Sequence, residues 1–286
     1  MAGNYRKQYK DVIFLNSGKL LYLNEVARQI RLLSLDSIYT AKSGHPGGSL
    51  SIAELLSYLY FHEMNVNPED PKACGRDRFV LSKGHGAPAL YAALALKGFF
   101  DKEELKTLRQ VGSRLQGHPD AKKVPGVDIG TGSLGQGYSA AAGMALMSNE
   151  KCKYNVYTIL GDGELQEGQI WETAMFIKHY NITNLYTFVD YNKVQLSGDV
   201  YEIAGLDMLR EKFESFGISV FNCNGHDIES IDSALSMAKA SGRPSVIICD
   251  TVKGKGVSFM ENSAKWHGSA PNDSQYEAAV KEIKEA

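Results

Sequence analysis

The sequence of 286 residues contains only four cysteines, and no two of them form a Cys-x-x-Cys pair. They are Cys74, Cys152, Cys223 and Cys249, which are far apart in the chain. Such dispersed cysteines argue against a zinc site and against a disulfide framework. We therefore expect reduced thiols, as is typical of a cytoplasmic protein.

The chain also lacks an excess of charge of either sign. Its 31 Lys and Arg residues against 33 Asp and Glu residues give a formal net charge of −2, which argues against nucleic acid or a membrane surface as a partner. No apolar run approaches the ~18 residues that span a bilayer, and the N-terminal segment has no apolar core or cleavage site of a signal peptide. These absences predict a cytoplasmic protein without a nucleic-acid or membrane partner.

The sequence does have strand and helix patterns that alternate along its length. Apolar residues recur at helical spacing over 19–41, and we expect this helix to end at Gly44 and Pro46. Further helices are expected at 52–63, 87–96, 102–109, 138–147, 166–179, 206–216, 228–240 and 274–286, and strands at 78–81, 156–160, 185–189, 218–221 and 245–249. Ser49 or Ser51 is a candidate cap for the second helix. The alternation predicts a single α/β domain over 1–286, with a mostly parallel sheet, helices on both faces and a polar tail from about residue 270.

The central stretch, 155–198, predicts a strand, a helix and a second parallel strand. Asp162 follows the first strand in a Gly-Asp-Gly turn, and Asn192 follows the second. Ligands of such sheets bind beyond the carboxyl ends of the strands. We therefore expect Asp162 and Asn192 to lie at neighbouring strand ends.

One carboxylate and one amide oxygen suit Mg²⁺, which takes its remaining ligands from water and phosphates. Gly161 and Gly163 allow the backbone to approach a ligand closely, and the following helix points its N-terminus at the same place, which favours an anion. The pattern predicts a metal-bridged diphosphate. The alternative is a loop in which Asp162 only caps a helix, and the later DYNKVQLSG motif favours the metal site.

Glycines also dominate the loop before residue 138. Residues 130–135, GTGSLG, match G-x-G-x-x-G, but a dinucleotide-binding motif should directly follow a strand. The preceding segment, KKVPG, is not a strand, so we interpret this loop as one whose backbone approaches a ligand.

The seven histidines divide into two groups. Three lie in or beside helices and are expected to be structural: His62, His179 and His226. The other four lie in glycine-containing loops: His45, His85, His118 and His267. Loop histidines at the ends of strands and helices are better candidates for chemistry, and four of them beside a diphosphate motif predict a site.

Seven motifs resemble those of the transketolase family, which uses thiamine diphosphate (ThDP). In chain order they are SGHPGGSLS, DRFVLSKGHGAPALYA, GHP, GTGSLGQG, GDGELQEGQIWE, DYNKVQLSG and DTVKGKGVSFMENSAKWHG. They cover the chain from about residue 20 to 270, and together they are very specific. Ser133 stands where many relatives have proline.

The resemblance implies a role for each matching residue. The Mg²⁺ ligands would be Asp162, Asn192 and the carbonyl of Val194, with Ca²⁺ or Mn²⁺ as substitutes. The residues that bind ThDP would be His85, Gly132, Ser133, Leu134, Asp162, Gly163, Glu164, Asn192 and His267. The catalytic residues would be His45, His85, His118 and His267, which line the sugar channel, and Glu167, a buried acid that links paired sites at the dimer interface. The cofactor supplies the hard chemistry, and neutral imidazoles, with an ordinary pKa of roughly 6.5, suit hydrogen bonding and proton transfer.

A complete transketolase has about twice this length or more, so the resemblance covers only the diphosphate-binding (PP) module. The pyrimidine-binding module, with the glutamate that activates the cofactor, has no counterpart in the sequence. The resemblance therefore implies the N-terminal subunit of a split transketolase, active with a separate C-terminal subunit in an α₂β₂ assembly. Such an enzyme transfers a two-carbon ketol unit from a ketose phosphate to an aldose phosphate.

Two other functions stay open. Deoxyxylulose-phosphate synthases and the α-subunits of 2-oxo-acid dehydrogenases share the Gly-Asp-Gly turn and the later asparagine, although LQEGQIWE together with paired GHP loops is not expected in them. A non-catalytic ThDP-binding subunit is the second alternative, because activity depends on a partner that the sequence does not contain.

Overall fold

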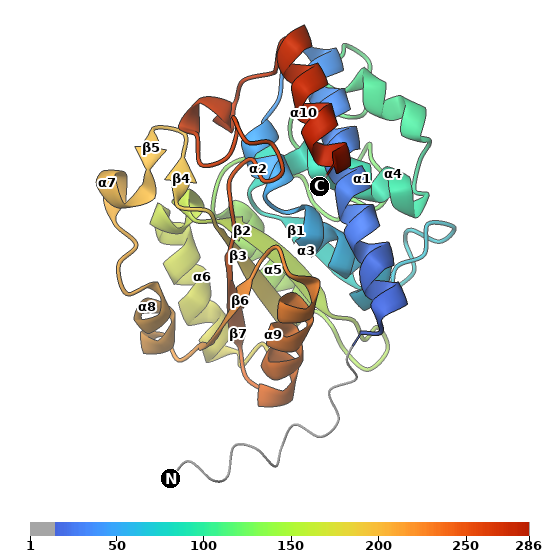
Figure 1. Ribbon diagram of the computed structural model, residues 1–286. Helices are drawn as coiled ribbons and strands as arrows, with labels where there is room; N and C mark the ends of the chain where they lie inside the picture. The colour runs from blue at the N-terminus through green and yellow to red at the C-terminus, as the bar shows by residue number, and fades with distance from the viewer. Residues whose placement is uncertain (1–14, 286) are drawn as a thin grey trace.

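Five parallel strands form the centre of the structure, a computed structural model that describes residues 15–285 (Figure 1). The strands lie in the order β1 (Arg78–Leu81), β2 (Val156–Gly161), β3 (Leu185–Tyr191), β7 (Ser245–Asp250) and β6 (Ser219–Asn224). Every neighbouring pair in this order is parallel. All five strands expected from the sequence are therefore present, and the mostly parallel sheet is confirmed. A small antiparallel pair, β4 (Val194–Gln195) and β5 (Gly198–Asp199), was not predicted.

Most of the helices follow the predicted ranges, with differences at tight turns. They are α1 (Ser17–Ala41), α2 (Pro46–Leu50), α3 (Ala53–Tyr58), α4 (Ala87–Lys97), α5 (Gln136–Leu146), α6 (Gly168–His179), α7 (Val200–Ala204), α8 (Leu209–Ser215), α9 (Ile228–Ser241) and α10 (Asp273–Glu285). The helix expected over 102–109 is only a 3₁₀ turn at Lys102–Thr107. Neither α2 nor α7 was predicted. Pro46 was interpreted only as the end of the preceding helix, whereas it occupies the first turn of α2, where its fixed φ and missing N–H are tolerated.

Helices cover both faces of the sheet, as predicted (Figure 1). Alternate residues of each strand point to opposite faces, so β2 directs Tyr157 and Ile159 into one core with α1, α3, α4 and α9. The same strand directs Val156 and Leu160 into a second core with α5, α6 and α8. Both faces being buried explains why the strand sequences are almost continuously apolar.

Neither serine proposed as a cap has that role. α3 begins at Ala53 without a side-chain cap. The Ser49 hydroxyl donates to the carbonyl of His45 at 2.8 Å, and the Ser51 hydroxyl donates to Asp190 Oδ2 at 2.8 Å. Both serines instead fix the loop beside His45 and the end of strand β3.

The prediction of four reduced cysteines is wrong for one pair. Cys74 and Cys152 form a disulfide whose Cα atoms are 5.5 Å apart. Each lies four residues before a strand, and β1 and β2 pair in register from Arg78 and Val156, so the parallel pairing brings two distant cysteines together. Cys223 and Cys249 remain buried free thiols, with their sulfur atoms 3.5 Å apart.

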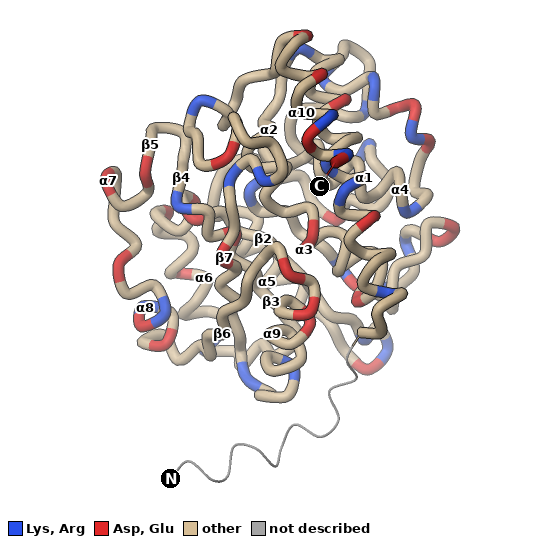
Figure 2. The backbone as a smooth tube through the Cα atoms, viewed as in Figure 1, with Lys and Arg blue, Asp and Glu red and all other residues tan. Residues whose placement is uncertain are grey.

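The C-terminal segment is a surface helix that is also part of the packed structure. α10 lies along α1 (Figure 1), with Ala279 and Ile283 buried and the Tyr276 hydroxyl donating to Asp36 at 2.9 Å. Within residues 15–285, no helix combines the length and the apolarity needed to cross a membrane. Lys and Arg residues are interspersed with Asp and Glu residues over the backbone (Figure 2).

Candidate active site

The central βαβ unit brings Asp162 and Asn192 to neighbouring strand ends, as the sequence predicted. Gly161 at the end of β2 pairs with Asp190 near the end of β3, and the two candidate ligands follow directly. A cavity of about 320 Å³ opens at this edge of the sheet. Its lining includes most of the predicted residues: His85, Gly132, Leu134, Asp162, Gly163, Glu164, Glu167, Asn192, Val194 and His267.

The three residues expected to hold a metal, Asp162, Asn192 and Val194, all line this cavity. Asp162 is buried, and its carboxylate accepts from Gly163 N at 2.7 Å and from Lys193 N at 2.5 Å. Burial, together with the negative charge of Asp190, raises the pKa of Asp162 to about 6. Asp162 also caps the 3₁₀ turn 163–166, so the capping role considered for it is real, although it does not explain the polar cavity.

The other two candidate metal ligands lie on the loop after β3. Asn192 Oδ1 accepts from Val194 N at 3.1 Å, and the Val194 carbonyl accepts from Lys253 Nζ at 2.7 Å. Among residues 15–285, no three His, Cys, Asp or Glu side chains form a metal-binding group. The expected site contains only one such side chain, because its other donors are an amide and a backbone carbonyl.

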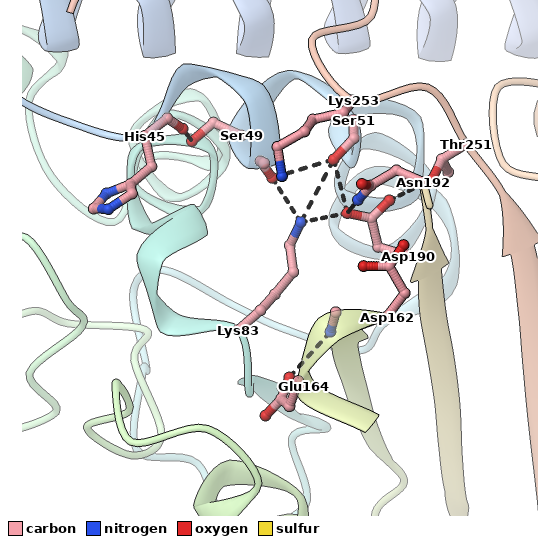
Figure 3. Close-up of polar contacts among 12 residues, drawn as sticks. His45, Ser49, Ser51, Lys83, Asp162, Glu164, Asp190, Asn192, Thr251 and Lys253 are labelled. Atoms are coloured by element: carbon pink, nitrogen blue, oxygen red, sulfur yellow. Dashed lines mark hydrogen bonds and ion pairs between the residues drawn. The ribbon is translucent and has the colours of Figure 1, made fainter. Parts of the chain in front are cut away.

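A buried charged network lies beneath the cavity, and the sequence did not predict it. Lys83 Nζ lies 2.5 Å from Asp190 Oδ2 and donates to the Gly48 carbonyl at 2.7 Å (Figure 3). Asp190 also accepts from Ser51, Thr251 and the Asn192 amide. Burial opposes its charge, but the ion pair and these hydrogen bonds together lower the pKa of Asp190. Because Asn192 Nδ2 donates to Asp190 at 2.9 Å, the orientation of the amide is fixed, with Oδ1 on the side of Val194 N.

The glycine loop is held against the end of β2 by Glu164. Its carboxylate accepts from the Ser82 hydroxyl, from Gly135 N at 2.8 Å and from Gly161 N at 3.0 Å. Gly132 has φ +154°, and a Cβ there would lie 3.1 Å from the ring of His118. The loop thus brings backbone to the cavity directly before α5, as expected, whereas Ser133 is exposed and not part of the cavity lining.

The four loop histidines converge from distant parts of the chain. The ring of His45 lies 5.4 Å from that of His85, 5.6 Å from that of His267 and 6.5 Å from that of His118. The rings of His85 and His267 are 4.9 Å apart. His85 and His267 also line the cavity, so the cluster adjoins the diphosphate motif. The sequence predicted one site from these four loops.

These imidazoles are neutral at neutral pH. Burial lowers the pKa of His45 to about 4, with Arg109 as the next cause. Burial lowers the pKa of His267 to about 3, with Lys253 as the next cause. The pKa values of His85 and His118 are also lowered, mainly by burial. The structure therefore lowers the pKa values of all four histidines below the value of roughly 6.5 for free histidine.

Two further residues that the sequence analysis named, Glu167 and His226, are not part of this histidine cluster. Glu167 is exposed in the single chain, and the expected burial at a dimer interface requires a second copy. His226 is bound at both ring nitrogens: Nδ1 lies 3.0 Å from Glu54 Oε2, and Nε2 accepts from Val252 N at 2.8 Å. This is the arrangement expected of a structural histidine.

The sequence and the structure are both similar to known proteins. Residues 23–285 match the family model described as transketolase, thiamine diphosphate binding domain. The chain belongs to the transketolase family. It is 48% identical over 263 residues to the 6-deoxy-6-sulfo-D-fructose transketolase subunit SqwG of Clostridium sp. (strain MSTE9), covering 91% of this chain and 96% of that protein. It is 44% identical to one subunit of the apulose-4-phosphate transketolase of Phocaeicola vulgatus, covering 88% and 90% respectively.

Transketolases of full length share the fold over part of their chains. The crystal structure of Campylobacter jejuni transketolase matches with a TM-score of 0.87 and 35% identity, covering 94% of this chain and 43% of that one. Human transketolase is 39% identical, with 93% of this chain and 42% of that protein covered. The predicted transketolase family, α/β fold and class of enzyme are thereby confirmed.

Proposed function

We propose that this chain is the thiamine diphosphate-binding subunit of a transketolase that moves a two-carbon ketol unit from a ketose phosphate to an aldose phosphate. The observation that carries the proposal is a cavity lined by the diphosphate motif and by His85 and His267, with the ring of His45 close to both and the ring of His118 beside His45. The names of the two subunit relatives, each of which is part of a transketolase, support it.

The residue types at the strand ends fit a hard divalent cation. Asp162, which follows β2, and Asn192 and the Val194 carbonyl, which follow β3, offer three oxygens at neighbouring strand ends. Burial and the negative charge of Asp190 raise the pKa of the Asp162 carboxylate. We propose that they hold Mg²⁺, with Ca²⁺ or Mn²⁺ as substitutes, beside the diphosphate. Lys253, which reaches the Val194 carbonyl, would neutralise part of the phosphate charge.

ThDP is proposed to bind along Gly132, Ser133, Leu134, Gly163 and Glu164, with His85, Asn192 and His267 around it. When bound, the cofactor supplies the carbon nucleophile that protein side chains lack. The chain's own part is to bind and orient the sugar and to stabilise charge on its oxygens. The neutral imidazoles of His45, His85, His118 and His267 present N–H donors without the cost of burying a charge.

A second polypeptide module is proposed to complete the site. The chain corresponds to less than half of the human and Campylobacter jejuni transketolases but to nearly all of the two subunit relatives. We propose a separate C-terminal subunit that carries the pyrimidine-binding module. In the cytoplasmic α₂β₂ assembly inferred by analogy, Glu167 would be buried near the two-fold axis.

The sugar at the far end of the channel is proposed to be selected largely by that partner. The two subunit relatives are named for different sugars, one with a sulfonate and one with a phosphate. The histidine cluster lies near the cofactor motif, where every ketose presents the same two-carbon unit.

Ketol transfer from a ketose phosphate should be measured with this chain by itself, with the C-terminal partner by itself and with their mixture, all with ThDP and Mg²⁺. We expect activity only in the mixture, and light scattering should give the mass of two copies of each chain. Full activity from this chain by itself would overturn the split-enzyme proposal.

A further inference from the structure

Arg109 lies in the loop 108–118, whose backbone conformation and Gly117 accommodate its side chain. Its backbone adopts the left-handed region at φ 60°, which costs free energy for a residue with a side chain, and its N–H donates to the Leu115 carbonyl at 2.8 Å. The guanidinium lies directly over Gly117, where a Cβ would come within 2.8–2.9 Å of it. The loop therefore folds so that the Arg109 side chain lies against bare backbone.

This guanidinium contacts the histidine cluster from one side. Nη1 donates to the Ser43 hydroxyl at 3.0 Å, and Nη2 lies 3.2 Å from His45 Nδ1. Arginine has only donors and remains protonated in proteins. A hydrogen bond between these two nitrogens can therefore form only if His45 Nδ1 carries a lone pair and no proton.

The state of the other ring nitrogen follows from this contact. Burial and the charge of Arg109 keep His45 neutral at pH 7 by lowering its pKa to about 4, so the ring carries one proton, and that proton must be on Nε2. The Nε2 edge faces the segment of His267, since a Cβ placed on Gly268 would lie 3.6 Å from it. The N–H thus points toward the cluster, and it has no hydrogen-bond acceptor within the described part of the chain.

We propose that Arg109 is a positioning residue that fixes His45 as the Nε2–H tautomer, so that His45 donates a hydrogen bond to an oxygen of the sugar substrate. This inference rests on the proposed transketolase function and makes it more specific. A neutral His45 with its Nδ1 bound to a cation cannot act as a general base at either nitrogen. It acts as an electrophile that stabilises negative charge developing on a substrate oxygen.

The tautomer can be read directly from imidazole ¹⁵N chemical shifts. The full chain, labelled with ¹⁵N-histidine, should be examined at pH 7 without cofactor or substrate, and His45→Gln assigns the resonances. We expect a protonated-type Nε2 and an unprotonated-type Nδ1 for His45 in the unmodified chain. A protonated Nδ1 would overturn the proposal, and this result does not depend on any ketol-transfer activity.

Substitutions separate the role of Arg109 from a general effect of charge. Arg109→Met should give a mixture of His45 tautomers, whereas Arg109→Lys, which keeps a charged donor, should restore the Nε2–H form at least in part. Arg114→Met is the matched control, because Arg114 lies in the same loop but pairs with Glu104 at 2.7 and 2.8 Å. An unchanged His45 spectrum in Arg109→Met, or an equal change in Arg114→Met, would contradict the assignment.

The consequence for catalysis is measured in the enzyme assembled with its C-terminal partner. Arg109→Met should lower kcat by about 10²-fold, the loss typical of one directed donor, with a smaller change in KM for the ketose and recovery in Arg109→Lys. A shifted tautomer with unchanged kcat would show that His45 donates to no substrate oxygen, and would refute that part of the proposal.

Discussion

Replacing Lys83 by methionine tests how the polar network beneath the cavity is stabilised. The side chains of Lys83 and Asp190 are only 2% and 0% exposed and lie 2.5 Å apart. Lys83→Met removes the positive partner and leaves the carboxylate of Asp190 buried with neutral donors only. Breaking a buried ion pair in this way costs about 3–5 kcal/mol.

This loss is large enough to measure by thermal unfolding. At about 2.1 cal/mol/K per residue, the unfolding entropy of the 286-residue chain is about 0.6 kcal/mol/K, so Tm should fall by about 5–8 °C. Scanning calorimetry without ThDP and Mg²⁺ keeps ligand binding out of the comparison. Lys106→Met is the control, because Lys106 forms an ion pair with Glu103 in which both side chains are largely exposed, and it should leave Tm unchanged.

A second variant identifies the cause of the loss. In Lys83→Met with Asp190→Asn the buried charge is gone, while the amide oxygen can still accept from Ser51 and Asn192. We expect the double variant to recover part of the lost stability. A fall in Tm below 2 °C for Lys83→Met, or a double variant less stable than the single one, would refute the reasoning that the network depends on charge compensation.

Three further predictions concern the site. Asp162→Ala and Asn192→Ala should each abolish Mg²⁺-dependent ThDP binding in the assembled enzyme, and unchanged affinity in calorimetric titrations of both would contradict the metal assignment. His45→Ala and His267→Ala should lower turnover by about 10²–10⁴-fold with a ketose phosphate donor, and losses below threefold would leave both as structural loop residues. Because the pKa of His45 is lowered to about 4, the unfolded chain binds more protons between about pH 6.5 and 4, so stability falls as the pH drops through this range. The stability of His45→Gln should fall less than that of the unmodified chain between pH 7 and 4.5, and equal losses would argue against the shift.

The sheet was predictable because its strands carry a local signal. Runs such as 156–160 and 185–189 are apolar on both faces and are bounded by turns, which identifies a buried parallel strand. Elements specified by a few residues were not predictable. α2 depends on Pro46 starting a helix, and the pair β4 and β5 depends on the loop after Asn192, which has no period to detect.

The candidate site was likewise predictable from the sequence only in part. Asp162 and Asn192 were located because parallel strands place their carboxyl ends side by side, a rule that needs only chain order. Lys83 and Asp190 were not found, because nothing in the sequence shows that a lysine in the loop after β1 and an aspartate near the end of β3 meet. The Cys74–Cys152 disulfide was missed for the same reason, because it depends on the register of two strands 78 residues apart.

A small hydrophobic cluster beneath α10 links the C-terminal helix to the segments that carry His45 and His267. Trp266, beside His267, packs in one cluster with Leu50 of α2, which follows His45, and with Ile283 of α10. Opening of that cluster would separate His45 from His267 while the central sheet stays intact. We therefore expect catalytic activity and the global fold to be lost at different denaturant concentrations. Amide exchange in α10 should increase at the concentration at which activity is lost. Coincident loss of activity and of the sheet would show instead that the C-terminal helix and the sheet unfold as one cooperative unit.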